Sequence, residues 1–504
     1  MATAYLTKSR YLAGLQCGRR LWRLVNDPQP YEVPAPGASF DVGAQVGQRA
    51  RLLFPGGVAV TAEPWQHTQA VAQTMALMDD PQVPAIFEAA FEHDNIRVRV
   101  DILCRNVDGS WGLTEVKSST GLKDHYIDDI ALQVFVLRGR GIILSSIELL
   151  YVNNAYVRGP KGIEWEQYFA RLDIADEVND RLRGLSANLA AMWENLNSPG
   201  LPFATPGKQC STPHGCEFWD ACTNDKPADW VANLPRLSTK QASELESRAI
   251  ESIAKIPADF RLTSRQGIIR DVLATGRPFV APDLSRLLHR FGPPALYLDF
   301  EAMMPAIPLY EGTRPYQPLP FQWSLHQMAA DGAISHEEYL ADGNDDPRRE
   351  FATTLIATLR DSDLPIIVYS PYEQTTLKAL ERHFSDLAPR LNTIINRLAD
   401  LLPIIRSAIY HADFQFSNSI KKVGPALCPD FGYDDLEDIA DGQAAAAAFT
   451  EIAGGFVTDT AAISKTRNNL LAYCKRDTLA MVEVHKALVM LSALGIPKVT
   501  PKRN

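Results

Sequence analysis

Residues 99–119 read Arg99-Val-Asp-Ile-Leu-Cys-Arg-Asn-Val-Asp-Gly-Ser-Trp-Gly-Leu-Thr-Glu-Val-Lys-Ser-Ser119, and this stretch predicts a β-hairpin. One apolar run, Ile96 to Leu103, ends at the turn signal Asn106-Val-Asp-Gly109. A second run, Trp111 to Val116, follows the turn. The two runs have the length and composition of paired strands, so we expect them to lie side by side.

Three chemically useful side chains fall on this hairpin. Glu115 and Lys117 are two residues apart on the second strand and therefore share a face. Asp101 on the first strand can lie beside them. Two carboxylates hold a hard cation through oxygen, the cation lowers the pKa of a bound water, and the lysine steadies the developing charge. Taken alone, Glu-Val-Lys is also compatible with an ordinary ion pair on a solvent-facing strand.

The sequence after the hairpin favours the metal site. A polar turn leads into an amphipathic helix expected from Asp124 to Arg138, which carries Gln133. The order Asp, Glu-x-Lys, then a helical Gln resembles the RecB-like branch of the PD-(D/E)XK nucleases, which includes the CRISPR-associated iron–sulfur exonucleases. The resemblance implies a nuclease site in which Asp101 and Glu115 bind Mg²⁺ or Mn²⁺, Lys117 is catalytic and Gln133 supports it.

One expected ligand of that family is missing from the sequence. Many RecB-like members carry a metal-binding histidine on an earlier helix, after a glycine. Here the helix expected from Asp41 to Phe54 contains Gly43, Gln45 and Gln48 but no histidine. Glutamine is a weak neutral ligand, so the metal shell has a gap at this point.

Four cysteines form a second pattern. Cys210, Cys216 and Cys222 are closely spaced, and Cys17 lies far upstream, in Leu15-x-Cys-x-Arg-Arg-Leu-Trp22. Thiolates at short spacing bind soft metals, so zinc with His214 or Cys17 as fourth ligand is one possibility. A 4Fe–4S cluster held by all four cysteines is the other.

Both cysteine segments resemble the cluster motif of the RecB-like iron–sulfur nucleases. Five residues separate Cys210 from Cys216, whereas two are usual in that family. A cluster at these positions would tie the first helix to the end of its domain and restrict the unfolded chain.

A second set of carboxylates lies in the C-terminal half. Asp299 and Glu301 end a short apolar strand expected from Ala295 to Ala302. Glu373 lies where a strand runs into a helix, and Tyr473 and Asp477 share one face of a helix expected from Asn468 to Leu479. Carboxylates from three elements can converge to hold two divalent ions at a phosphodiester.

This set resembles the DEDDy exonucleases, the DnaQ-like branch of the RNase H fold. The resemblance implies 3′→5′ hydrolysis, with Asp299, Glu301, Glu373 and Asp477 as metal ligands and Tyr473 orienting the attacking water. The second motif of that family usually ends in aspartate, so Glu373 is a departure, and Asp400 is an alternative ligand.

The chain of 504 residues is too long for one ordinary domain. We expect an α/β protein with a RecB-like PD-(D/E)XK domain at 1–225, a helical connector at 226–293 and a DnaQ-like domain at 294–504. We also expect one helix over residues 8–23, capped by Ser9, and a long helix or helical pair over 164–195.

Composition limits the partners. The formal net charge of −10 argues against non-specific electrostatic binding of nucleic acid over the whole surface, although a local basic groove is enough for a nuclease to bind its substrate. No run of about 18 apolar residues occurs and the N-terminus lacks the apolar core of a signal peptide, so we expect a cytoplasmic protein without membrane partners.

The sequence therefore predicts a two-site, metal-dependent DNA nuclease that acts on single strands or free ends, in repair, defence or spacer processing. Two alternatives stay open. One is an RNA 3′→5′ exonuclease, because the DnaQ-like fold serves both polymers. The other is a nucleic-acid-binding scaffold with one degenerate nuclease site, which the missing histidine and Glu373 motivate.

Overall fold

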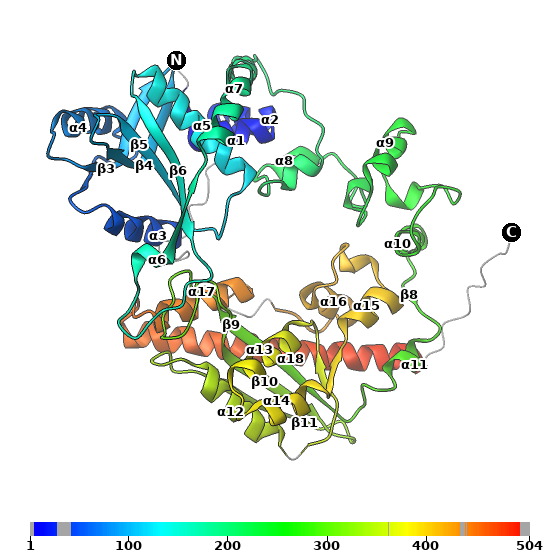
Figure 1. Cartoon of the computed structure of the whole chain (residues 1–504). Helices are drawn as coiled ribbons and strands as arrows, with labels where there is room; N and C mark the ends of the chain where they lie inside the picture. The colour runs from blue at the N-terminus through cyan, green and yellow to red at the C-terminus, as the bar shows by residue number, and fades with distance from the viewer. Residues whose placement is uncertain (1–4, 28–41, 361, 434–438, 440, 494–504) are drawn as a thin grey trace. The chain divides into compact units, whose positions relative to one another are not determined.

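The computed structural model describes residues 5–27, 42–360, 362–433, 439 and 441–493 (Figure 1). Helices and strands alternate along the chain, so the expected mixed α/β class is confirmed. The chain divides into two compact units. Unit 1 combines residues 1–225 with 305–317, and unit 2 combines 226–304 with 318–504.

Unit 1 begins with a short strand and two helices and continues as a sheet with helices on both faces. Its elements are β1 (Leu6–Thr7), α1 (Lys8–Gln16), α2 (Gly18–Asn26), α3 (Val42–Ala50), η1 (Arg51–Leu53), β2 (Val58–Ala59), α4 (His67–Asp79), β3 (Ala85–His93), β4 (Ile96–Arg105), β5 (Trp111–Lys117), α5 (Asp124–Gly139), β6 (Leu144–Val152), α6 (Trp165–Tyr168), β7 (Phe169–Asp173), α7 (Ala175–Leu196), η2 (Lys208–Ser211) and α8 (Trp219–Thr223).

The sheet of unit 1 has the order β2-β3-β4-β5-β6-β7. The predicted hairpin is confirmed as the antiparallel pair β4–β5, and β5 is parallel to β6. The short strand β1 also pairs with β4, in parallel, with Leu6 beside Ile96 and Thr7 beside Arg97. The ends of β1 and β5 therefore approach each other along the same edge of β4.

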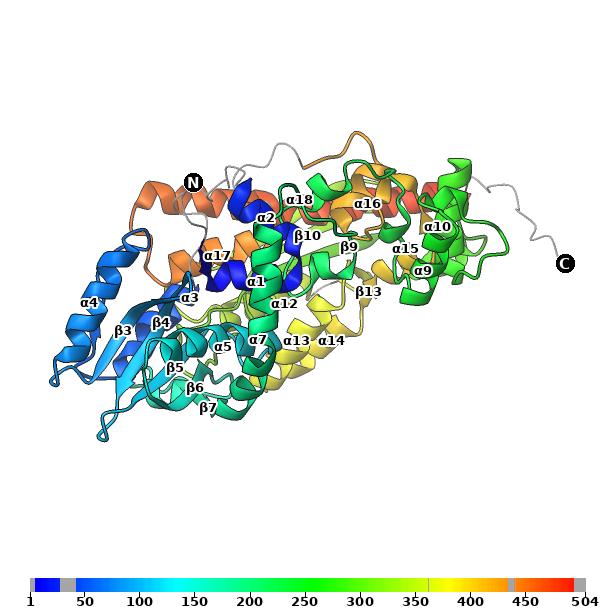
Figure 2. The same ribbon diagram turned by 90° about the horizontal axis from the view of Figure 1, so that it is seen from above.

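Helices cover both faces of this sheet. One core contains buried residues of α1, α2, α4, α5 and α7. Figure 2 shows α5 and α7, which pack together, beside the sheet. The other core joins α3 and α6 to Ala306, Ile307 and Tyr316 from the segment 305–317. That segment is therefore part of the hydrophobic core of unit 1, although the sequence places it between two strands of unit 2.

Unit 2 has a smaller sheet and more helix. Its elements are η3 (Val231–Asn233), α9 (Thr239–Ser247), η4 (Ile253–Lys255), α10 (Ser264–Thr275), β8 (Phe279–Val280), α11 (Leu284–Leu288), β9 (Ala295–Met303), β10 (Leu319–Met328), β11 (Ile334–Leu340), α12 (Arg348–Leu359), β12 (Ile366–Val368), α13 (Tyr372–His383), α14 (Ala388–Ile395), β13 (Leu398–Asp400), α15 (Leu402–Ala408), β14 (Ile409–Tyr410), η5 (Ala412–Phe414), α16 (Ile420–Leu427), α17 (Gly442–Ala453) and α18 (Thr460–Ala493).

The main sheet of unit 2 has the order β11-β10-β9-β12-β13. The strands β9, β10 and β11 are antiparallel, whereas β12 and β13 run parallel to β9. Helices α12, α13 and α14 share a core with one face of the sheet. The helix α18 shares another core with β9, with α15 and with residues of 226–293. The segment expected to be a separate connector is thus packed into unit 2.

Two local predictions were wrong. The single helix expected over residues 8–23 is divided into α1 and α2, because the backbone of Cys17 is extended, and the cap of α1 is Thr7 rather than Ser9. The helical region expected over 164–195 contains the strand β7, which pairs with β6. Among the described helices, none combines the length and the apolar character that crossing a membrane would require.

Candidate functional site

The first candidate site lies in unit 1, where β4 and β5 diverge. The last paired residues of the two strands on this side are Ile102 and Thr114. Beyond that pair, the side chain of Asp101 on β4 contacts β5, and its Oδ2 accepts a hydrogen bond from the backbone amide of Val116 at 2.7 Å. This bond takes the place of a backbone–backbone hydrogen bond between the two strands and holds the Asp101 carboxylate near the end of β5.

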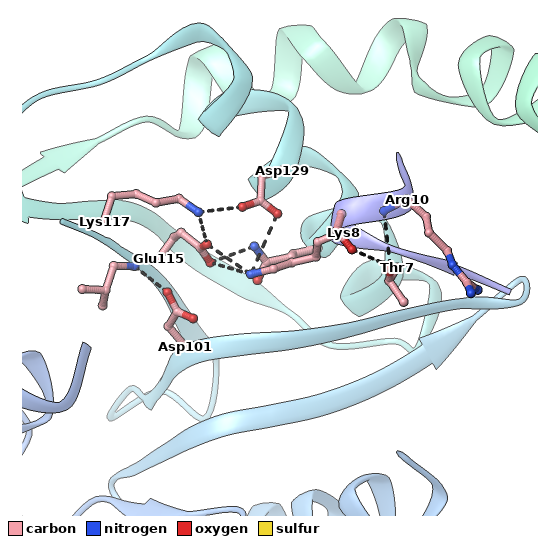
Figure 3. Close-up of polar contacts among 10 residues, drawn as sticks. Thr7, Lys8, Arg10, Asp101, Glu115, Lys117 and Asp129 are labelled. Carbon is pink, nitrogen blue, oxygen red and sulfur yellow. Dashed lines mark hydrogen bonds and ion pairs between the residues drawn. The ribbon is translucent and has the colours of Figure 1, made fainter. Parts of the chain in front are cut away.

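The residues predicted from the hairpin and the following helix meet here (Figure 3). Lys117 Nζ donates to Glu115 Oε1 at 2.7 Å. Gln133 Nε2, from α5, donates to Glu115 Oε2 at 2.8 Å. Glu115 and Gln133 are buried, with only 1% and 0% of their surfaces exposed. The predicted set of Asp101, Glu115, Lys117 and Gln133 is therefore gathered around one carboxylate.

Two charged residues of this site were missed from the sequence. Asp129 on α5 accepts from Lys117 Nζ at 2.8 Å. Lys8, the first residue of α1, lies 3.1 Å and 3.3 Å from the two carboxylate oxygens of Glu115. Asp129 stands one helical turn before Gln133, which is a local signal that could have identified it. Lys8 has no comparable signal because only the pairing of β1 with β4 brings it here.

The charges of the site control its protonation. Burial, followed by the charge of Glu115, raises the pKa of Asp101 to about 7. Burial also opposes ionisation of Glu115, but the charges of Lys8 and Lys117 outweigh it and hold the pKa of Glu115 below its usual range. The pKa values of both lysines are raised, because the attraction of Glu115 and Asp129 exceeds the effect of burial.

The donor set fits a divalent metal ion. Asp101 and Glu115 supply carboxylate oxygens, which Mg²⁺ and Mn²⁺ prefer. Asp129 Oδ1 and Gln133 Oε1 are buried without a hydrogen-bond partner among the residues described. At the expected position of the missing histidine, Gln48 is exposed on α3 and Gln45 is half-buried.

The four cysteines predicted to bind a cofactor line one cavity of unit 1. Cys17 lies between α1 and α2, Cys210 in η2, Cys216 in a loop and Cys222 in α8. Their side chains are all partly exposed. The loop between them is compact, because the amide of Cys216 donates to the carbonyl of Cys210 at 2.7 Å. Three arginines of α2, at positions 19, 20 and 23, line the same cavity.

The second candidate site lies in unit 2 and contains the other predicted carboxylates. Asp299 and Glu301 point from the C-terminal half of β9, Glu373 from the start of α13 and Asp477 from the middle of α18. The pKa of Asp299 is raised well above its ordinary value by burial and then by the charges of Asp477, Glu373 and Glu301. Asp299, Glu373 and Asp477 line one cavity, and ligand atoms of Asp299 and Glu301 lie within 4.8 Å of each other, so the four side chains surround one point.

Burial also raises the pKa values of the neighbouring carboxyl groups. Burial, followed by the charge of Asp477, raises the pKa of Glu301 to about 8. Burial raises the pKa of Glu373 to about 7, although hydrogen bonds from Ser370 and Asp299 oppose the shift. The charge of Glu373 contributes to the shift at Asp299, and the charge of Asp400 in turn contributes to the shift at Glu373. Asp400 Oδ1 accepts from the amide of Leu402 at 2.8 Å.

Two tyrosines and a lysine complete this site. Burial raises the pKa of Asp477, whereas the hydroxyls of Tyr433 and Tyr473 favour its ionised form. Lys421 Nζ lies 4.7 Å from the ring centre of Tyr473 and 5.8 Å from that of Tyr433. Its charge favours ionisation of Glu301 and Asp477. Tyr433 was not predicted from the sequence.

Buried hydrogen bonds hold α18 against the sheet at this site. Thr478 Oγ1 lies 2.8 Å from Ser324 Oγ and 2.8 Å from His326 Nδ1, both on β10. Gln322 Nε2, also on β10, donates to the carbonyl of Leu470 at 2.9 Å. Ser324 is paired with Asp299 across the strands, so these contacts fix Asp477 relative to β9.

The donors of the second site also fit a divalent metal. Ligand atoms of Asp299, Glu301 and Cys474 lie within 4.8 Å of one another. Burial raises the pKa of the Cys474 thiol far above its ordinary value, so the carboxylates are the ligands for a hard cation. A cavity of about 370 Å³ opens beside them, lined among others by Tyr369, Arg406 and Asn418.

Comparisons with known proteins add little about chemistry. A family model described as Domain of unknown function (DUF2779) matches residues 296–419, which include Asp299, Glu301 and Glu373. No curated protein matches. One similar solved structure is titled "Crystal structure of SSO0001" and is 11% identical, with a TM-score of 0.17, covering 40% of this chain and 89% of that chain.

Proposed function

We propose that the protein is a metal-dependent nuclease with two sites that hydrolyse phosphodiester bonds. In this proposal unit 1 is a RecB-like PD-(D/E)XK domain and unit 2 is a DnaQ-like DEDDy domain. The observation that carries it is the convergence of carboxylates from three separate elements: Asp299, Glu373 and Asp477 line one cavity, and ligand atoms of Asp299 and Glu301 lie within 4.8 Å of each other. Burial, followed by the charges of the other three, raises the pKa of Asp299 well above its ordinary value. Buried carboxyl groups at such density require cations to ionise together.

In the second site the chain's own residues position the substrate and a water. The carboxylates would hold a divalent cation, which would supply charge neutralisation at the phosphate and lower the pKa of a water. The Tyr473 hydroxyl, which favours the ionised form of Asp477, is placed to orient the attacking water. Lys421 provides positive charge beside the same tyrosine. The neighbouring cavity of about 370 Å³ is in the size range of small-molecule sites, so it can admit a terminal nucleotide.

In the first site Asp101 and Glu115 are the proposed metal ligands. Lys117 stabilises the charge that develops on the phosphate, and its ammonium is kept charged by Glu115 and Asp129. Gln133 fixes one oxygen of Glu115 and thereby leaves the carboxylate in a defined orientation. This arrangement supports the catalytic roles predicted from the hairpin motif.

We assign a 4Fe–4S cluster to the four cysteines, because all four line one cavity of unit 1 although Cys17 is far from the others in the sequence. Zinc is the alternative occupant. An anaerobic preparation that is brown and contains iron would support the cluster, whereas a colourless protein with stoichiometric zinc would identify a zinc site.

The test uses end-labelled single- and double-stranded DNA and RNA with Mg²⁺ or Mn²⁺. Wild type is compared with Lys117→Ala, Asp299→Ala and the double variant, with Lys161→Ala as a control at an exposed lysine of unit 1. We expect cleavage of DNA from free ends, with each single variant removing one component and the double variant inactive. Cleavage of RNA alone would instead identify an RNA exonuclease.

Two results would contradict the proposal. If wild type cleaves none of these substrates with either metal, the protein is not the proposed nuclease. If the double variant keeps full activity, the observed cleavage comes from residues other than those assigned.

A further inference from the structure

The first site contains a second lysine, Lys8, whose ammonium lies beside the carboxylate of Glu115, a proposed metal ligand. Lys8 Nζ contacts both carboxylate oxygens of Glu115, at 3.1 Å and 3.3 Å, and lies 3.8 Å from Asp129 Oδ1. Lys117 contacts only one oxygen of Glu115. A cation that faces both oxygens of a carboxylate occupies the position of a bidentate divalent ion. Figure 3 shows the Lys8 ammonium directed at Glu115.

The surroundings explain why Glu115 holds a cation. The side chain of Glu115 is only 1% exposed and that of Asp129 only 4%. A buried carboxylate is stable in its charged form only when it is paired. A divalent ion on Glu115 would stand within a few ångströms of the Lys8 ammonium, and like charges at that separation repel strongly inside a protein.

The position of Lys8 is determined by the fold at both ends of its helix. The pairing of Thr7 with Arg97 places the start of α1 beside β4, and Thr7 Oγ1 accepts the capping bond from the amide of Arg10 at 3.3 Å. At the other end, the side chain of Gln16 donates to the carbonyls of Gln209 and His214 in the cysteine loop, at 2.6 Å and 2.9 Å. The contact with Glu115 is therefore built into the architecture of unit 1.

We propose that Lys8 is a built-in counter-ion of Glu115 that competes with the divalent cation for this carboxylate. Metal loading of the first site then requires the Lys8 ammonium to withdraw from Glu115. The inference rests on the proposed metal-dependent function of this site. It adds a positioning residue that sets the metal concentration at which the first site becomes loaded.

The test measures Mn²⁺ binding by calorimetry, without nucleic acid. The full chain carries Asp299→Asn to weaken binding at the second site, and Glu115→Gln in this background identifies the first-site event as the one it removes. In the same background we compare Lys8→Met with Lys161→Met, whose lysine is exposed in the same unit. We expect Lys8→Met to lower the Kd for Mn²⁺ roughly tenfold, about 1.4 kcal/mol, and Lys161→Met to leave it unchanged.

Lys8→Arg keeps the positive charge and is expected to retain the Kd of the parent. A Kd for Lys8→Met that is unchanged within about twofold, or higher, overturns the proposal, as does a tightening in Lys8→Arg equal to that in Lys8→Met. Thermal melting checks folding, and Lys8→Gln, which can still donate to Glu115, replaces Lys8→Met if that variant unfolds. The calorimetry contains no nucleic acid, so its result does not depend on cleavage. If wild type fails in the separate cleavage assay, the nuclease function is refuted, but this comparison of Kd values still tests the role of Lys8.

Discussion

Two tyrosines face Asp477 in the second site, and we expect only one of them to act on the substrate. Tyr473 lies on α18 one turn before Asp477, with Lys421 closer to its ring than to that of Tyr433. We predict that Tyr473→Phe lowers kcat of the second site about 100-fold, within the usual range for a group that assists proton transfer. Tyr433→Phe is the matched control and should lower kcat less than about tenfold.

Both variants keep the aromatic ring, so the comparison isolates the hydroxyl. Single-turnover cleavage of end-labelled DNA in a Lys117→Ala background reports the second site alone. A larger loss for Tyr433→Phe than for Tyr473→Phe would show that the roles of the two tyrosines are reversed.

Glu301 should make the metal-free protein sensitive to pH. The pKa of Glu301 is about 8 in the folded chain and near 4.5 in the unfolded chain. Between pH 4.5 and pH 8 the folded state therefore keeps a carboxyl proton that the unfolded state has lost. The free energy of unfolding therefore falls as pH rises through this window. We predict that Glu301→Gln changes little at pH 5 but stabilises the metal-free protein by about 1–3 kcal/mol at pH 8.

Urea unfolding in the presence of a chelator measures this difference. Glu311→Gln, at an exposed glutamate outside the site, is the control and should follow wild type at both pH values. An equal effect of Glu301→Gln at pH 5 and pH 8 would show that Glu301 is not protonated in the folded state.

At the residue scale, what the sequence could predict depended on spacing. Glu115 and Lys117 were found because a strand places residues i and i+2 on one face. Tyr473 and Asp477 were found because a helix does the same for i and i+4. Lys8 could not be found in this way, because it reaches Glu115 only through the pairing of β1 with β4.

Elements with a strong internal period were predicted, and elements that depend on a partner were not. The apolar spacing of α5 defines a helix without reference to the rest of the chain. The strand β7 has only five residues between two helices, and its conformation is set by pairing with β6. The break between α1 and α2 at Cys17 was likewise missed, because arginines and leucines on both sides favour one continuous helix.

We expect the buried hydrogen bonds between Thr478 and β10 to fix the position of α18 at the second site. Thr478→Val keeps the shape of the side chain but leaves Ser324 and His326 without this partner. We predict a loss of about 1–3 kcal/mol in the free energy of unfolding and a reduced kcat at the second site, because Asp477 is the preceding residue.

Urea unfolding and second-site cleavage are measured on the same preparations. Thr353→Val, at an exposed threonine of α12, is the matched control and should change neither quantity appreciably. If Thr478→Val unfolds like wild type, other contacts of α18 determine its position.

At the scale of the whole molecule, the chain of unit 1 is discontinuous. The sequence placed residues 305–317 in the C-terminal domain expected at 294–504, and nothing in their composition indicates where they pack. In the structure Tyr168 Oη donates to the carbonyl of Ala306 at 3.1 Å, and Arg158 Nη1 donates to the carbonyls of Pro308 and Leu309 at 2.8 Å and 2.7 Å. The Tyr316 hydroxyl donates to the carbonyl of Ser118, next to Lys117.

This arrangement predicts that the first site depends on residues 305–317. Replacing them with a Gly/Ser linker of equal length removes Ala306, Ile307 and Tyr316 from the core of unit 1 while leaving β9 and β10 intact. We expect first-site cleavage to fall at least about tenfold, because small displacements at a catalytic residue are costly. Second-site cleavage should stay within about twofold of wild type, since Asp299 and Glu301 precede the replaced segment.

Assays in Asp299→Ala and Lys117→Ala backgrounds separate the two activities, and Tyr316→Phe tests the contact with Ser118 alone. Equal losses at both sites would mean that the segment supports the chain as a whole, whereas an unchanged first site would show that unit 1 is complete without it.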